Sequence, residues 1–150
     1  MSEALLDVNV LIALLDPRHV HHEQAHGWFA STPSAGWATC PLTQNAVLRI
    51  LGQPRYPNSP GPPAVVAPLM QELIRHPRHH FWPDVISLLA APGGEAPLVD
   101  ATQLLEAGQI TDSYLLALAV HHGGTLVSFD RRLGCGAVAG GSSALRLIPT

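Results

Sequence analysis

Lysine is absent from this chain of 150 residues, and all eight basic residues are arginine. Charged residues make up only 13% of the sequence and the formal net charge is −3. The composition therefore provides no broad basic surface for nonspecific nucleic-acid binding. The missing lysine also excludes phosphatases and receiver domains that place an aspartate after their first strand, because these proteins need a lysine to neutralise the phosphoryl group.

Cysteine and long apolar runs are scarce as well. Cys40 and Cys135 form neither a disulfide framework nor a paired-thiol motif, which favours a reducing, cytoplasmic location. No apolar run reaches the roughly 18 residues of a membrane span, and the start of the chain has no basic segment of the kind that opens a signal peptide. Apolar residues make up 47% of the sequence, so we expect residues 1–150 to fold as a single domain.

Short apolar runs alternate with longer helical patterns along the chain. The predicted strands are 4–6, 36–40, 79–83, 125–129 and, at an edge, 145–149. One predicted helix begins directly after Asp7. The others cover 19–31, 41–51, 64–76, 84–92 and 112–122, with a short helix within 93–108. Residues 52–63 contain five prolines and predict a stiff loop. This alternation indicates a three-layer α/β/α sandwich with a mainly parallel central sheet.

Three acids fall where such a sheet binds its ligands. Asp7 and Asp130 each follow a predicted strand, and Asp112 begins a predicted helix. In parallel sheets, ligands bind outside the carboxyl ends of the strands. Each acid also has an ordinary explanation, because Asp112 gains about 0.3–1 kcal/mol from the helix dipole and the other two stabilise turns.

The three acids taken together indicate a cation site. Two carboxylates about 4 Å apart repel each other by about 4 kcal/mol at an effective dielectric constant near 20. Such a cluster persists only with a cation or with bound protons. A site made of oxygen atoms, without histidine or cysteine, prefers Mg²⁺ or Mn²⁺, and these ions activate water and assist phosphoryl transfer.

Four segments, LLDVNVLIALL, TCPLTQNAVLRIL, ITDSYLLALA and LVSFDRRL, occur in this order over nearly the whole chain. They resemble the four motifs of the PIN domain, and most closely those of the toxin ribonucleases in VapBC-type toxin–antitoxin pairs. The resemblance implies a compact α/β/α domain with Mg²⁺- or Mn²⁺-dependent RNA endonuclease activity. It also implies a cognate VapB-like antitoxin as partner and a homodimer.

The resemblance assigns site residues by position. The metal-binding, catalytic acids of the family fall on Asp7, Asp112 and Asp130. Asn9 matches a small polar residue that supports the first acid, and Ser128 matches a hydroxyl residue near the last one.

Gln44 is a departure from the family pattern, because it stands where the family usually has a second, catalytic glutamate. A neutral amide removes one negative charge from the expected metal site. The alternative reading is therefore a catalytically weakened PIN fold that binds RNA or a partner without cutting. A DNA-cutting flap-type nuclease is a further alternative, but those enzymes are usually larger and carry basic clamping elements that this chain lacks.

Arginines and histidines complete the candidates. Phosphate contacts are expected from Arg49, Arg55, Arg131 and Arg132, although each of these is also an ordinary surface residue or ion-pair partner. His22 and His26 have the spacing of zinc ligands on a helix. We favour a solvated surface for them, because no cysteine pair supports a zinc site.

Overall fold

The computed structural model describes residues 2–31, 35–91 and 96–150. Its central sheet has the strand order β3-β2-β1-β4-β5, and every neighbouring pair is parallel. The strands are β1 (Ala4–Leu6), β2 (Trp37–Thr39), β3 (His79–Phe81), β4 (Thr125–Ser128) and β5 (Leu145–Leu147). All five predicted strands are confirmed, including the one at 145–149, which forms an edge of the sheet.

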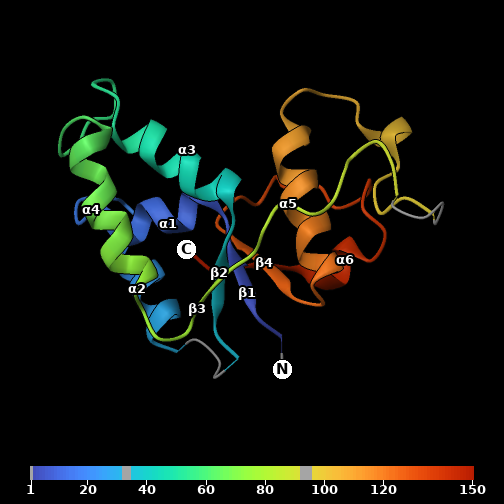
Figure 1. The fold of residues 1–150 in the computed structure, drawn as a ribbon, viewed down its shortest axis with the longest axis horizontal. Coiled ribbons are helices and arrows are strands. Elements are labelled where there is room, and N and C mark those ends of the chain that lie inside the picture. The colour runs from blue at the N-terminus through green and yellow to red at the C-terminus, as the bar shows by residue number, and fades with distance from the viewer. Residues whose placement is uncertain (1, 32–34, 92–95) are drawn as a thin grey trace.

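Helices cover both faces of this sheet (Figure 1). On one face lie α1 (Val8–Leu15), α2 (His22–Ala30), α3 (Pro41–Leu51) and α4 (Pro63–Ile74). On the other lie α5 (Gln109–His121) and the short α6 (Gly141–Ala144), and a 3₁₀ turn, η2 (Ala101–Gln103), precedes α5. The predicted three-layer α/β/α architecture is confirmed. No helix in the described ranges is long and apolar enough to cross a membrane.

Two apolar cores hold the layers together, one on each face of the sheet. The alternation of side chains along the strands separates them: Leu6 and Trp37 pack against α1–α4, whereas Leu5 and Leu126 pack against α5. All four of these side chains are fully buried. Strands that are apolar on both faces are typical of parallel sheets covered by helices, so the central strands are fixed firmly enough to hold functional groups at their ends.

The predicted helix at 84–92 is wrong for residues 84–91, which are not helical, and Pro92 lies outside the described residues. Ile86 and Leu88 pack against the second core, whereas Val85 and Leu89 are exposed. This spacing of two residues is that of an extended chain. Burial of alternate side chains after Pro83 therefore overrides the helical tendency of this leucine- and alanine-rich segment.

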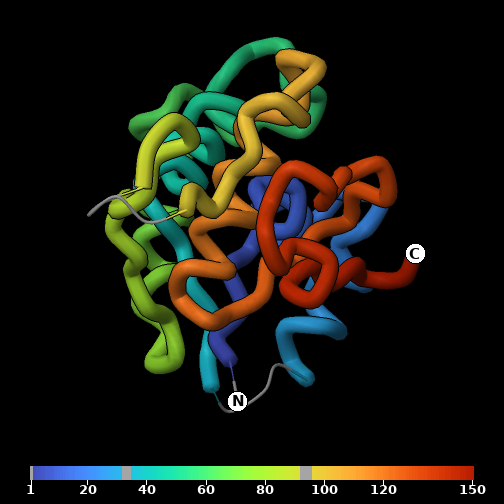
Figure 2. The backbone as a smooth tube through the Cα atoms, turned by 90° about the vertical axis from the view of Figure 1, so that its right-hand side faces the viewer, coloured from blue at the N-terminus to red at the C-terminus, as the bar shows by residue number. Residues whose placement is uncertain are grey.

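The proline-rich stretch is a loop, as predicted, and a buried acid anchors it. Asp16, just after α1, accepts hydrogen bonds from the hydroxyl of Tyr56 and, at 3.0 Å, from the side-chain amide of Asn58. In Figures 1 and 2 this loop and the segment that leads into α5 lie at the end of the molecule opposite the N-terminus. Because β1 begins at that terminus and all strands are parallel, both segments border the carboxyl edge of the sheet.

Candidate functional site

Asp7 lies at the carboxyl edge, between β1 and α1. Its backbone N–H donates to the carbonyl of Val127 on the adjacent strand β4, at 2.9 Å. Its side chain caps α1, because Oδ1 accepts from the backbone N–H of Val8 at 2.8 Å. Only 6% of Asp7 is exposed. The end of β1 and the start of α1 therefore fix this carboxylate at the centre of the edge.

A hydrogen-bond network joins Asp7 to the end of β4. The hydroxyl of Ser128 donates to Asp7 Oδ2 at 2.7 Å and accepts from the backbone N–H of Asp130 at 3.0 Å. The side-chain amide of Asn9 donates to the same hydroxyl at 3.1 Å, and its oxygen accepts from the N–H of Phe129 at 3.2 Å. Asn9 and Ser128, which the family resemblance assigns to supporting positions, thus both contact Asp7.

Asp112 completes the group of acids from the opposite layer. It lies in the first turn of α5. Burial, followed by the charges of Asp7 and Asp130, raises its pKa to about 6. The pKa of Asp7 is raised as well, first by burial, with opposition from its Ser128 and Val8 hydrogen bonds and a further rise from Asp130. The structure therefore brings the three predicted acids into one electrostatic environment.

The three acids do not form a preformed metal-binding site. Among the described residues, no three His, Cys, Asp or Glu side chains stand close enough together to hold a metal ion directly. Both oxygens of Asp7 already accept hydrogen bonds. The donor chemistry, all carboxylate oxygen, still suits Mg²⁺, which usually keeps several waters and takes only one or two carboxylates as direct ligands.

Gln44 lies in the first turns of α3, at the same edge, but its amide nitrogen is engaged. It donates to the hydroxyl of Thr39, at the end of β2, at 3.0 Å. That hydroxyl also contacts His79 Nε2 at 2.7 Å. Burial, followed by the charges of His80 and His76, lowers the pKa of His79. Thr39 and His79 were not among the predicted site residues, although the position of Thr39 near the end of a predicted strand is a signal that could have identified it.

Comparison with known proteins confirms the family resemblance of the sequence. The family model of the PIN domain matches residues 4–134. Ribonuclease VapC44 of Mycobacterium tuberculosis is 45% identical over 91% of this chain and 92% of its own length. Ribonuclease VapC39 of the same organism is 39% identical over 91% and 95%, and Ribonuclease VapC29 is 36% identical over 86% of both chains. The chain belongs to the PIN-domain family. Within the family it is VapC-like.

The predicted arginines of this PIN domain occupy different places. Arg49, on α3, lines a hollow together with Asp84 and with Thr111, the residue before Asp112. Arg131 follows Asp130 and donates to the Thr150 hydroxyl at 2.8 Å. Arg132 donates its backbone N–H to Asp130. Arg55 is exposed in the proline-rich loop, where no contact within the described residues links it to the acids.

The histidines considered as zinc ligands are capping residues in this PIN domain. A ring nitrogen of His22 lies 2.7 Å from the carbonyl of Ala13, and one of His26 lies 3.0 Å from the carbonyl of Leu14. Both carbonyls belong to the last turn of α1, where helix carbonyls lack partners within the helix. The two rings therefore fasten α2 to the end of α1.

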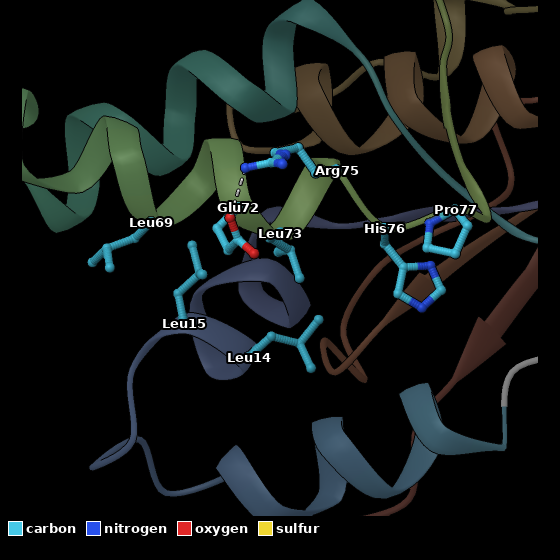
Figure 3. Close-up of a pocket in the computed structure, with 8 residues that line it drawn as sticks. All are labelled: Leu14, Leu15, Leu69, Glu72, Leu73, Arg75, His76 and Pro77. Atoms are coloured by element: carbon cyan, nitrogen blue, oxygen red, sulfur yellow. Dashed lines mark hydrogen bonds and ion pairs between the residues drawn. The ribbon is translucent and has the colours of Figure 1, made fainter.

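A groove lies between α1 and α4 (Figure 3). It has a volume of about 590 Å³, and its walls include Leu14, Leu73 and His76. Glu72 and Arg75 form an exposed ion pair of 3.3 Å there. None of the predicted acids lines this groove, so it is separate from the candidate active site of the PIN domain.

The raised pKa of Asp112 predicts a pH-dependent stability in the absence of divalent ions. Because the folded pKa is about 6 and the ordinary value is 3.8, the unfolded chain loses this proton first as the pH rises. Stability then falls between about pH 4 and pH 6, and the cost is fully present above pH 6. Asp112→Asn removes this cost, so we expect its Tm in EDTA to exceed that of the natural protein by about 2–4 °C at pH 7.5.

The same comparison at pH 4 should show a much smaller difference in Tm, because the carboxyl is then protonated in the folded state and only partly ionised in the unfolded state. Asp100→Asn, at an exposed acid near η2, is the matched control and should give no such pH-dependent gain. A Tm difference for Asp112→Asn that stays constant from pH 4 to pH 7.5 would contradict the assignment.

Proposed function

We propose that this PIN domain is a metal-dependent endoribonuclease and the toxin of a type II toxin–antitoxin pair. The observation that carries the proposal is the grouping of Asp7, Asp112 and Asp130 at one sheet edge, where burial and mutual repulsion raise the pKa of two of them. Relatives named ribonucleases, at 45% and 39% identity over 91% of the chain, support RNA as the substrate class.

Mg²⁺ or Mn²⁺ is the cofactor that suits this group. We expect one or two of the three carboxylates to be direct ligands and water to complete the coordination. The reason is that no three such side chains among the described residues are close enough to hold the ion together. When bound, the ion would neutralise charge on the scissile phosphate and lower the pKa of the attacking water.

The chain's own residues divide the remaining work. Ser128 and Asn9 orient Asp7, and the hydrogen bond from the backbone of Asp130 to Ser128 keeps Asp130 beside it. The pKa of Asp112, which is raised to about 6, suits a group that accepts a proton from water. We expect phosphate contacts from Arg49, which lines a hollow with the residue before Asp112, and from Arg131, which follows Asp130 in the chain. Arg55 is a more distant candidate. The expected products carry 5′-phosphate and 3′-hydroxyl ends.

One observation favours the alternative of a binding module without cleavage. The amide nitrogen of Gln44 is held by Thr39, and a neutral side chain adds no charge for a cation. A protein of this kind would bind RNA or a partner at the same edge and release it uncut. An RNA cleavage assay across a titration of Mg²⁺ or Mn²⁺ separates the two functions.

The proposed partner is a VapB-like antitoxin that places a cation among the carboxylates. A bound arginine or lysine would replace the charge of the metal ion and relieve the repulsion that raises the pKa of Asp112. We also propose a homodimer, since exposed large apolar residues such as Leu105 and Leu147 remain on the surface. Light scattering on the isolated toxin tests the dimer.

The acids are tested by single substitutions in an RNA cleavage assay with added Mg²⁺. Asp7→Asn, Asp112→Asn and Asp130→Asn should each lower the cleavage rate by at least about 100-fold, because each removes a charge that holds the ion or the proton. Asp100→Asn should cleave like the natural chain. If two of the three active-site variants retain full activity while remaining folded by circular dichroism, the proposed site is wrong.

Gln44→Glu tests the departure from the family pattern. An added charge at roughly 4–5 Å contributes several kcal/mol at a dielectric constant near 20 before desolvation. We expect at least about 1.4 kcal/mol to remain, which tightens Mg²⁺ binding about tenfold in calorimetry. The natural chain should cleave RNA at millimolar Mg²⁺ or with Mn²⁺, which accepts neutral ligands more readily.

Gln71→Glu, which adds a charge on the exposed side of α4, is the control and should leave Mg²⁺ affinity unchanged. Cleavage by Gln44→Glu together with no cleavage by the natural chain at any metal concentration would establish the binding module instead.

The antitoxin contact is tested by neutralising two of the three acids. A double variant, Asp112→Asn with Asp130→Asn, removes two acceptors for an antitoxin cation, and a hydrogen bond to a charged group contributes about 1.5–3 kcal/mol. We expect the complex to weaken at least about tenfold and to lose most of its salt dependence. Unchanged affinity would show that the antitoxin docks elsewhere, for example in the groove of Figure 3.

A further inference from the structure

A second polar hollow adjoins the acids, between α3 and α5, and we name it the α3–α5 pocket. Asn45 and Arg49 of α3, Asp84 of the segment after β3, and Thr111 of α5 line it, and its volume is about 400 Å³. Two of these residues are chain neighbours of site residues, since Thr111 precedes Asp112 and Asn45 follows Gln44. Consecutive Cα atoms are only about 3.8 Å apart, so the pocket lies directly beside the proposed cleavage site.

One carboxylate oxygen of Asp84 is hydrogen-bonded within the protein, and the other is available to a ligand. The hydroxyl of Tyr114 on α5 donates to Asp84 Oδ1 at 2.6 Å. No other hydrogen bond or ion pair is found for this carboxylate within the described ranges. One oxygen is therefore positioned by the protein, while the second can accept hydrogen bonds from a ligand.

Arg49 gives the same pocket a cation. Within the part of the chain that the structure describes, the one ion pair joins Arg75 and Glu72, so Arg49 pairs with no carboxylate. Arg49 and Asp84 line the same hollow without contacting each other. Apolar walls from Pro41, Leu42 and Ala46 complete it. A planar ligand with adjacent donors and acceptors on its rim would satisfy both charged groups and pack against these walls.

Among the nucleobases, guanine has that rim. Its N1–H and N2–H₂ groups are two adjacent donors that a single carboxylate can accept, and its O6 and N7 atoms are acceptors for a guanidinium. Uracil offers one ring N–H, cytosine one amino group, and adenine no second donor beside its amino group. Unpaired bases of RNA expose these edges, and proteins that read RNA sequence use them.

We propose that the α3–α5 pocket binds an unpaired guanine next to the scissile phosphate, with Asp84 accepting from N1–H and N2–H₂ and Arg49 donating to O6 and N7. The inference rests on the proposed ribonuclease function and adds the sequence preference of that activity. Tyr114 is then a positioning residue, because it acts on the base only through Asp84.

The experiment begins with a randomised single-stranded RNA decamer, whose cleavage products are sequenced to find the preferred base beside the cut. The best sequence is then synthesised with guanine or inosine at that position. Inosine lacks only the N2 amino group, so it removes one donor to Asp84. We expect the natural protein to cleave the guanine substrate about tenfold faster, within the range of a single bidentate base contact.

Asp84→Asn should abolish the difference between guanine and inosine, because an amide has one acceptor oxygen and cannot accept from N1–H and N2–H₂ together. Arg49→Gln should lower cleavage of guanine and remove discrimination against 7-deazaguanine, which lacks the N7 acceptor. Glu72→Gln, at an exposed acid on α4, is the control and should keep both preferences. Thermal melting confirms that each variant is folded, and Asp84→Ser serves as a second variant at the same position.

Equal cleavage of guanine and inosine by the natural protein, or an unchanged preference in Asp84→Asn, overturns this inference while the ribonuclease function stands. No cleavage of the library at any Mg²⁺ or Mn²⁺ concentration overturns the proposed function. In that case, fluorescence anisotropy of the labelled guanine and inosine decamers in EDTA still tests the pocket. Tighter binding of guanine that is lost in Asp84→Asn supports it, and equal binding rejects it.

Discussion

The hydrogen bond from Ser128 to the buried carboxylate of Asp7 connects the ends of the two central strands, β4 and β1. Asp7 also caps α1, so one side chain fixes the strand ends and the first helix together. The rest of the edge depends on it, because Ser128 positions the backbone of Asp130 and Asn9 joins the network from α1. The group that we assign to chemistry is thus also a structural junction.

This junction places like charges close together, and the two cores make that possible. Burial and neighbouring acids raise the pKa values of Asp7 and Asp112, which means that the ionised cluster disfavours the folded state. Fully buried Leu5 and Leu6 face opposite cores from the same strand, and burying such a side chain contributes roughly 1.5–3 kcal/mol. A sheet packed on both faces therefore offsets the repulsion at its edge, and the proposed cation would remove it.

Sequence patterns were sufficient for the strands, the layers and the grouping of acids, because strand ends in a parallel sheet meet at one edge. They failed where tertiary packing decides the outcome, as in residues 84–91, where burial of alternate side chains overrides helical tendency. The contact of Tyr114 with Asp84 was equally invisible, since it joins α5 to that extended segment. The partners of Gln44 depend on the pairing of β2 with β3, which no local motif encodes.

The hydrogen-bond direction at Gln44 explains why an amide suits this chain. Burial, followed by the charges of His80 and His76, lowers the pKa of His79. When the neutral ring carries its proton on Nδ1, it accepts from Thr39 through Nε2. The Thr39 hydroxyl has then used its proton and must accept from Gln44, which an amide N–H can supply and a carboxylate cannot. A glutamate here would take the Thr39 proton and require His79 to donate through Nε2. Its charge would therefore be coupled to the tautomer or protonation state of the half-buried His79, as well as to the repulsion among the acids.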